Sequence, residues 1–364
     1  MKIGIVGLPN VGKSTFFNVL TKQNVKIDRY PFTTVNPNLG NVEVPDKRLK
    51  ALKNVFNPER VVPTSINFLD VAGLVKGASH GEGLGNKFLA QIRDTDAIVH
   101  VVRCFEDINV AHINTVLSPK RDIEIVNLEL ILADLSVIEK SLDRTKIASK
   151  SGKKEELKRL EVLTKIRDSL QKGDTVRAIG LNEYESRIIK GLNLLTQKPV
   201  IYVANVDEDY YTINKGRELV KEIEDIVKLD KAEVIIISAK ILHELSEIPD
   251  ENAQEFAKDM KIPYESLNEF IRASYELLDI ITFFTGNKNE VHTWTVKRNT
   301  PVVKAAGKIH SDMEKGFIKA EVINWKDLSD AGSVSRAKYM GIYRVEGRDY
   351  PVKDGDVIYI HFHI

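Results

Sequence analysis

Gly7-Leu8-Pro9-Asn10-Val11-Gly12-Lys13-Ser14 fits the pattern G-x-x-x-x-G-K-[ST] and directly follows an apolar run at residues 3–6. This order predicts a strand, a phosphate-binding loop and a helix that begins near Lys13. Glycines let the backbone bend so that successive N–H groups point at phosphate oxygens, and the helix N-terminus adds partial positive charge. Lys13 would reach the β- and γ-phosphates, and the Ser14 hydroxyl would ligate Mg²⁺. The stretch therefore predicts a nucleoside triphosphatase.

Two downstream segments complete the predicted metal site. Asp70 ends an apolar strand in the pattern Asp-x-x-Gly, where a carboxylate can hold Mg²⁺ through water and the N–H of Gly73 can sense the γ-phosphate. Thr34, in a polar loop with two prolines, is expected to add a hydroxyl ligand, although it also fits an ordinary loop threonine. Many GTPases carry a water-orienting Gln after the glycine, but Leu74 stands there. The attacking water must therefore be positioned by another group.

The predicted base-reading motifs are Asn205-Val206-Asp207-Glu208 and Ser238-Ala239-Lys240, each after an apolar strand. They take the places of Asn-Lys-x-Asp and Ser-Ala-Lys in GTP-binding domains. The Asp carboxylate of the first motif pairs with guanine N1–H and the 2-amino group, donors that adenine lacks. Here Glu208 is one methylene longer and Val206 replaces the Lys. The altered motif favours ATP, and the alternative is a GTPase in which Glu208 or Asp207 still reaches guanine.

The periodicity of apolar residues predicts three domains. Residues 1–121 and 199–276 would form the nucleotide-binding domain, which residues 122–198 interrupt as an inserted helical, coiled-coil-like domain. Strands predicted at 280–284, 291–296, 320–323 and 357–362, with a helix near 301–313, make 277–364 a β-rich module. The inserted domain is predicted to form a helical hairpin with a basic tip. This tip could contact RNA phosphates, or it could simply be exposed to solvent.

Composition limits the classes of partner. Lys and Arg number 53 against 52 Asp and Glu, so no DNA-binding surface is expected from net charge. The single cysteine, Cys104, follows an apolar run and predicts a buried thiol in a reducing compartment. No run of 18 apolar residues appears, so we expect no membrane span. We therefore expect a cytoplasmic protein. We also expect a monomer, because the apolar stripes of the two helices in the inserted domain can pair with each other.

Several motifs together resemble the YchF family, the Obg-like ATPases. They are Gly-Leu-Pro-Asn-Val-Gly-Lys-Ser, Tyr-Pro-Phe-Thr-Thr, Asp-Val-Ala-Gly-Leu-Val-Lys-Gly-Ala, Gly-Glu-Gly-Leu-Gly-Asn, Val-Val-Arg-Cys-Phe and Asn-Val-Asp-Glu. The resemblance covers essentially the whole chain. It implies an α/β fold: a Ras-like phosphate-loop NTPase domain of the Obg group with an inserted α-helical hairpin, plus a C-terminal β-grasp (TGS) domain. It also implies ATP preferred over GTP, binding to the ribosome (large subunit or ribosomal RNA), and a role in translation or stress responses.

The resemblance also implies roles for individual residues. Val206 would contact the base, and His112 takes the place of a family histidine implicated in hydrolysis, although a surface histidine is the plain alternative. His80 is a second candidate for that role. Asn10 suggests that K⁺ sits beside the phosphates and stimulates turnover. The predicted nucleotide-binding residues are Asn10, Val11, Gly12, Lys13, Ser14, Thr15, Asn205, Val206, Glu208, Ser238 and Ala239. The predicted metal ligands are Ser14, Thr34 and, through water, Asp70, and the predicted catalytic residues are Lys13 and His112.

The resulting hypothesis is Mg²⁺-dependent hydrolysis of ATP by a nucleotide-controlled switch. Lys13, the loop N–H groups and Mg²⁺ would stabilise charge on the transferring phosphoryl group, and His112 would accept a proton from water. A non-enzyme alternative stays open, in which nucleotide gates the binding of a ribosome or RNA and hydrolysis is incidental.

Overall fold

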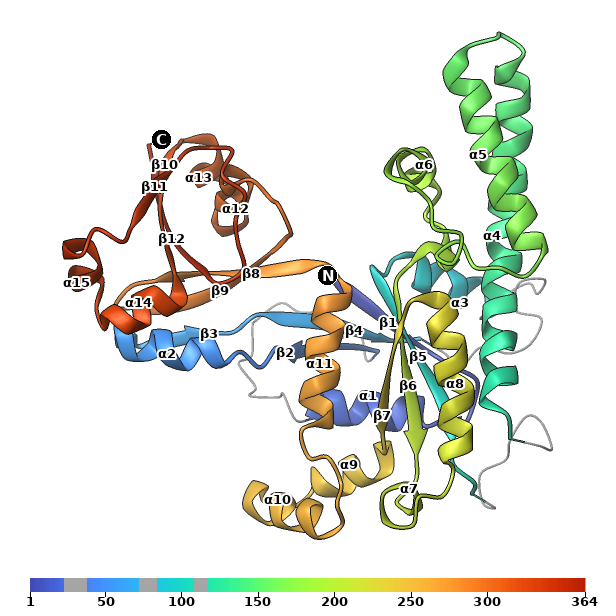
Figure 1. Cartoon of the computed structure of the whole chain (residues 1–364), viewed down its shortest axis with the longest axis horizontal. Helices are drawn as coiled ribbons and strands as arrows, with labels where there is room; N and C mark the ends of the chain where they lie inside the picture. Colours follow the sequence, from blue (N-terminus) through green and yellow to red (C-terminus); the bar gives the residue numbers. More distant parts are fainter. Residues whose placement is uncertain (23–37, 72–83, 108–116, 364) are drawn as a thin grey trace. The chain divides into compact units, whose positions relative to one another are not determined.

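The computed structural model of the chain describes residues 1–22, 38–71, 84–107 and 117–363. The chain divides into two compact units (Figure 1). The first unit contains Met1–Val42 and Asn67–Phe270, and the second contains Glu43–Ile66 and Ile271–Ile364. The second unit therefore takes a segment from the N-terminal third of the chain, which the predicted boundaries had placed in the nucleotide-binding domain.

A six-stranded sheet forms the centre of the first unit, in the order β2-β4-β1-β5-β6-β7. Its strands are β1 (Lys2–Val6), β2 (Leu39–Glu43), β4 (Ser65–Asp70), β5 (Ala97–Cys104), β6 (Val200–Val206) and β7 (Glu233–Ile237). Strand β1 runs parallel to β4 and β5, and β6 runs parallel to β5 and β7. Every residue of β5 and β6 is buried, as expected for apolar strands covered on both faces. The carboxyl ends of these parallel strands therefore meet at one edge, where ligands of such sheets bind.

The first unit also contains the helices that follow in chain order. They are α1 (Lys13–Lys22), α3 (Leu84–Arg93), α4 (Pro119–Ser149), α5 (Lys154–Gln171), α6 (Glu183–Ile189), α7 (Asp209–Thr212), α8 (Arg217–Asp230), α9 (Ala239–Leu245) and α10 (Asp250–Asp259). Short 3-10 turns lie at Lys190–Leu192 and Leu195–Gln197, and α11 (Ser266–Leu277) follows α10. In the described part of the chain no helix is both long and apolar enough to cross a membrane.

Helices α4 and α5 form the predicted hairpin, which projects from the sheet (Figure 1). Ser118 caps α4 and Pro119 occupies its first turn, a favourable arrangement for a helix start. The two helices share an apolar seam that includes Ile138, Leu142 and Ile166. This seam confirms that the two apolar stripes of the sequence pair with each other.

The second unit contains another six-stranded sheet, in the order β11-β10-β12-β8-β9-β3. Its strands are β3 (Arg60–Val62), β8 (Ile280–Gly286), β9 (Glu290–Lys297), β10 (Phe317–Asn324), β11 (Arg344–Glu346) and β12 (Asp356–Phe362). Its helices are α2 (Lys47–Phe56), α12 (Val302–Ile309), α13 (Ser311–Lys315), α14 (Trp325–Ala331) and α15 (Val334–Tyr339). An antiparallel hairpin, a helix and a final strand parallel to the first are the order of a β-grasp, as predicted.

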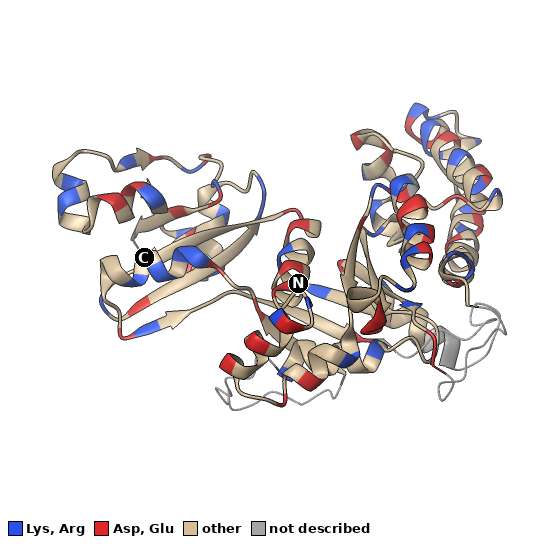
Figure 2. Cartoon of the chain, turned by 60° about the horizontal axis from the view of Figure 1, so that its bottom comes forward, with Lys and Arg blue, Asp and Glu red and all other residues tan. Residues whose placement is uncertain are grey.

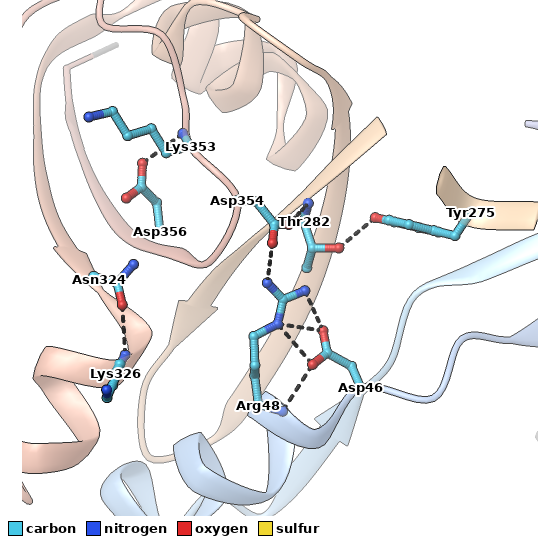
Figure 3. Close-up of polar contacts among 9 residues, drawn as sticks. All are labelled: Asp46, Arg48, Tyr275, Thr282, Asn324, Lys326, Lys353, Asp354 and Asp356. Carbon is cyan, nitrogen blue, oxygen red and sulfur yellow. Dashed lines mark hydrogen bonds and ion pairs between the residues drawn. The ribbon is translucent and has the colours of Figure 1, made fainter. Parts of the chain in front are cut away.

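Residues 43–66 contribute strand β3 to this second sheet and helix α2 to the same unit. Strand β3 pairs in parallel with β9, so Val61 lies opposite Val291. The guanidinium of Arg48 contacts Asp46 and, 2.7 Å away, Asp354 (Figure 3). It also lies 5.1 Å from the centre of the Phe284 ring. Because Asp354 and Phe284 are far from Arg48 in sequence, local pattern alone did not predict their association.

Candidate functional site

The phosphate loop lies between β1 and α1, at the carboxyl edge of the first sheet. Gly12 has φ 88° and Asn10 has φ 63°, both in the left-handed region that glycine and asparagine tolerate best. A Cβ at Gly7 would lie 2.6 Å from the carbonyl oxygen of Val101. The backbone path therefore requires glycine at positions 7 and 12.

Lys13, Ser14 and Asp70 come together at this edge. Register places Asp70 beside Ile5, so the ends of β4 and β1 bring the carboxylate to the start of α1. Asp70 forms an ion pair with the Lys13 ammonium, and its other oxygen accepts a hydrogen bond from Ser14 Oγ at 3.3 Å. Lys13 is only 8% exposed, so its ammonium is largely shielded from solvent beside Asp70.

This pair of oxygen donors fits Mg²⁺. The ion prefers hard oxygen ligands, and it is usually held by one or two protein groups together with waters and substrate phosphates. Within the described ranges, no three His, Cys, Asp or Glu side chains form a cluster that could hold a metal on its own. Ser14 and Asp70 are the described residues that would hold Mg²⁺ at this edge.

Asn205 connects the phosphate loop to the second base-reading motif. Its buried amide donates a hydrogen bond to the carbonyl oxygen of Val11 at 2.8 Å and accepts one from the backbone N–H of Ala239 at 3.0 Å. Both halves of the amide are thus used within the protein. Asn205 acts here as a positioning group between two loops that are distant in sequence.

The remaining base-reading residues differ in exposure. Ser238 is buried and caps α9 by accepting from Ile241 N at 3.5 Å. Val206 is also buried, whereas Glu208 is exposed at the start of α7. Asp207 is half-buried, and burial raises the pKa of its carboxyl although it accepts a hydrogen bond from Tyr210 N. The long carboxylate of the altered motif therefore lies at the surface.

A cavity of about 300 Å³ opens at the same sheet edge. It is lined by Cys104, Phe105, Glu106, Leu117, Asp207, Lys215, Gly216, Glu218 and Leu219. Cys104 is 3% exposed, which confirms the predicted buried thiol, and burial raises the pKa of that thiol. The sequence did not predict this cavity, because its walls come from four separate segments. The aromatic Phe105, directly after β5, was the available signal.

Several predicted residues lie outside the described residues. These are Thr34, His80, His112, Gly73 and Leu74. Thr15 is described and lies half-buried in the first turn of α1. The structure thus brings together the phosphate loop, Asp70 and the two base-reading motifs, and leaves the roles of Thr34 and His112 as predictions.

These features define a phosphate-loop nucleoside-triphosphate-binding protein of the G-domain class. Residues 2–129 match a family described as "50S ribosome-binding GTPase". Residues 280–363 match the YchF-GTPase C-terminal family, described as "Protein of unknown function (DUF933)". Relatives that align with the chain over nearly its full length show that it belongs to the YchF family.

The curated relatives align over nearly their whole length. "Ribosome-binding ATPase YchF" of Bacillus subtilis is 45% identical over 361 residues, covering 99% of each chain. Its namesake in Haemophilus influenzae is 47% identical over 363 residues, covering 100% of this chain and 99% of the relative. Among solved structures, the Schizosaccharomyces pombe YchF GTPase is 34% identical with a TM-score of 0.89, covering 99% of this chain and 97% of its own. The names of these relatives thus differ between ATPase and GTPase.

A more distant structure shares the fold. A GTP-binding protein from Pyrococcus horikoshii OT3 is 21% identical, has a TM-score of 0.63 and is covered completely, as is this chain. At that identity the likeness concerns the fold alone. Together with the family assignment it confirms the predicted α/β fold with a C-terminal domain.

Proposed function

We propose that this chain is a Mg²⁺-dependent ATPase that acts as a nucleotide-controlled switch, binds ribosomes and modulates translation or stress responses. The observation that carries the catalytic part is the convergence of Lys13 and Ser14 on Asp70 beside the phosphate loop. The identity of 45–47% with proteins named ribosome-binding ATPases, over the full length, supports ATP and the ribosome as partners. The large subunit or ribosomal RNA is the proposed contact.

The protein's own groups account for charge stabilisation. Lys13 would exchange the Asp70 carboxylate for the β- and γ-phosphates, and the loop N–H groups would bind the remaining phosphate oxygens. Ser14, Thr34 and Asp70 are the residues that would hold Mg²⁺, which when bound neutralises charge on the phosphates. Asn205 keeps the loop in place through its bond to Val11. Potassium beside Asn10 remains a further hypothesis, which identical rates in KCl and NaCl would remove.

His112 is the proposed group that orients the attacking water. Leu74 has no polar atom to do so, and a neutral imidazole can accept a proton near pH 7. His112→Ala should lower turnover by about 100-fold or more, the usual contribution of such a group, while ATP affinity stays nearly unchanged. His363→Ala, which removes an exposed histidine of the second unit, is the control, and His80→Ala tests the second candidate. Equal turnover of His112→Ala and the unmodified chain would remove this role.

Nucleotide choice is the experiment that tests the ATPase assignment. Equilibrium binding of ATP and GTP analogues with Mg²⁺ should show tighter binding of the ATP analogue, and Glu208→Asp should shift the preference towards GTP. The exposed position of Glu208 and the buried Val206 support weak guanine recognition. Tighter GTP binding by the unmodified chain would reclassify it as a GTPase of the same fold.

Ribosome binding is tested by sedimentation with purified ribosomes in the presence of ADP or a non-hydrolysable ATP analogue. A switch predicts that affinity differs between the two nucleotides. Lys and Arg alternate with Asp and Glu along the hairpin formed by α4 and α5, so its charge is mixed rather than uniformly basic (Figure 2). Equal binding with both nucleotides would contradict the switch and leave simple association.

A further inference from the structure

The connection between two strands of the first sheet runs through the second unit. Strands β2 and β4 are neighbours in the first sheet, and the backbone N–H of Asp70, at the end of β4, donates a hydrogen bond to the carbonyl oxygen of Asn38 at 2.8 Å. The residues that join the two strands, 44–64, belong to the second unit. We call these residues the strap. The strap therefore leads directly into the strand that carries the predicted metal ligand Asp70.

Little slack separates the strap from Asp70. Its strand β3 pairs with β9 of the second sheet, and only Pro63 and Thr64 lie between the end of β3 and the start of β4. The ring of Pro63 fixes its φ angle. Thr64 is 8% exposed, and its carbonyl oxygen accepts a hydrogen bond of 2.9 Å from Val44 N, which closes the two ends of the strap. Because rigid secondary elements carry displacements along their length, a shift of β3 would move β4 and the Asp70 carboxylate.

Side chains of α2 also attach the strap to the second unit. Leu52 is fully buried in an apolar core that it shares with Phe284. The Arg48 guanidinium, whose side chain is 19% exposed, lies 2.7 Å from Asp354. Asp354 in turn accepts a hydrogen bond of 2.9 Å from Thr282 N on β8 (Figure 3). The ion pair between Arg48 and Asp354, which we call the clasp, therefore holds α2 to the turn before β12 and, through that turn, to β8.

We propose that the strap couples the nucleotide site to the second unit, with Arg48 as a positioning residue for Asp70. In this arrangement the packing of the second unit sets where the Asp70 carboxylate lies. A Mg²⁺-nucleotide bound beside Asp70 stabilises the second unit in return, because coupling between two sites is reciprocal. The alternative is a strap that only anchors the chain, so that nucleotide leaves the second unit unaffected. The inference rests on the proposed function only for a Mg²⁺-nucleotide beside Lys13, Ser14 and Asp70.

The chain carries a natural probe of the second unit. Both of its tryptophans, Trp294 and Trp325, lie in that unit. Trp325 adjoins the clasp: a Cβ added at Gly355 would lie 2.5 Å from Trp325 Cδ1 and 3.5 Å from Arg48 Nη1. Tryptophan fluorescence therefore follows unfolding of the second unit, whereas the phosphate loop belongs to the first.

The test is urea unfolding of the full chain, followed by tryptophan fluorescence, with and without a non-hydrolysable ATP analogue and Mg²⁺. Coupling predicts that the ligand raises the midpoint by up to about 1 M, the shift for full transmission from a ligand at roughly 100 times its Kd. The shift should shrink when EDTA replaces Mg²⁺ at saturating analogue, because Asp70 acts through the metal. An unchanged midpoint at analogue concentrations that calorimetry shows to saturate the chain, or an equal shift in EDTA, would overturn the proposal.

Arg48→Ala tests the clasp. It should weaken Mg²⁺-dependent binding of the analogue at least about 5-fold, the lower end for coupled sites, and leave the affinity in EDTA unchanged. Arg298→Ala is the matched control, because the Arg298 side chain is 60% exposed and its pair with Asp279 lies in the same unit outside the strap. The positioning role is refuted if Arg48→Ala matches Arg298→Ala in both affinities, or if it loses affinity equally with and without Mg²⁺.

The proposed function and the coupling fail separately in these experiments. If the ATP analogue binds and the tryptophan midpoint does not respond, the ATPase assignment stands and the coupling is refuted. If only a GTP analogue binds, the ATPase assignment is refuted, and the same unfolding experiment with the GTP analogue decides the coupling.

Discussion

At the scale of single residues, the phosphate loop depends on one buried amide. Asn205 bonds both Val11 and Ala239, so two loops about two hundred residues apart are held by one side chain. The spacing of the motif predicted the loop itself, because its glycines and Lys13 are defined by local backbone requirements. The ion pair between Lys13 and Asp70 could not be read from sequence, since it depends on the register of β1 against β4.

Gly12→Ala should disrupt this arrangement. The backbone at Gly12 has φ 88°, and an added Cβ would collide with the amide nitrogen of Asn205. Left-handed backbone alone costs a residue with a Cβ about 1–2 kcal/mol. We expect ATP affinity to fall at least 10-fold, measured by titration with an ATP analogue. Gly191→Ala, where the Cβ would meet open space, is the control and should bind normally.

The buried His100 should make the stability of the folded chain depend on pH. Complete burial in β5, with a smaller effect from Arg177, lowers its pKa from 6.5 to about 3. The unfolded chain therefore binds a proton below about pH 6.5 that the folded chain does not bind. The free energy of unfolding should fall as pH decreases through this window, by about 1.4 kcal/mol per pH unit for one such group.

Urea unfolding at about pH 7 and about pH 5 measures this linkage. His100→Gln should show a shallower loss of stability between the two pH values than the unmodified chain. The exposed His363→Gln controls for removal of a histidine elsewhere. The linkage is refuted if His100→Gln loses as much stability as the unmodified chain.

At the scale of elements, one buried carboxylate attaches the hairpin to the segment that returns to the sheet. Asp134 of α4 accepts hydrogen bonds of 2.8 Å from Leu195 N, Thr196 N and Thr196 Oγ1. The apolar periodicity predicted the helices α4 and α5, because period is a local property. It gave no sign of the Asp134 contact, in which a polar residue on an apolar stripe meets a backbone turn.

Asp134→Ala should destabilise the chain by about 2–5 kcal/mol, because it leaves buried donors without their acceptor. The change is measured as the shift in the urea midpoint followed by circular dichroism. Asp143→Ala on the same helix is the control: its side chain is 78% exposed and its pair with Lys146 is 3.9 Å, so the cost should stay below about 0.5 kcal/mol. Equal shifts for the two variants would contradict the inferred role of Asp134.

The helix predicted near residues 301–313 shows a limit of pattern reading. The structure has two helices there, α12 and α13, separated at His310, whose backbone is extended with φ −158°. His310 instead caps α13, since its side chain accepts from Asp312 N at 3.2 Å. The apolar residues on the two sides of the break are still spaced as in one continuous helix. Their spacing alone therefore did not reveal the interruption.

At the scale of the whole molecule, the sequence predicted every strand of the first sheet except β2, and most strands of the second. It missed β3, β11 and the grouping of residues 43–66 with the C-terminal unit. Domain boundaries drawn along a chain assume that neighbours in sequence stay together. Here Leu52 and Phe284, both fully buried, share one apolar core although more than two hundred residues separate them.

We expect residues 271–364 alone to be less stable than the same residues joined by a flexible linker to residues 43–66. The short fragment lacks Arg48 and Leu52, and full burial of one leucine side chain contributes about 1.5–3 kcal/mol. Urea unfolding of the two proteins gives the comparison. The joined protein should have the higher midpoint; equal midpoints would show that residues 43–66 add nothing to the stability of this unit.

The second unit is built from two parts of the chain that are far apart in sequence, and this also affects synthesis of the protein. Residues 43–66 leave the ribosome early, whereas the strands they join begin after residue 271, roughly 200 residues later. At about 5–20 residues per second this interval lasts on the order of 10–40 s. During that time Leu52 and its apolar neighbours on α2 have no partner strands to cover them. A nascent chain of this protein therefore exposes an early hydrophobic segment that a chaperone could bind until translation is complete.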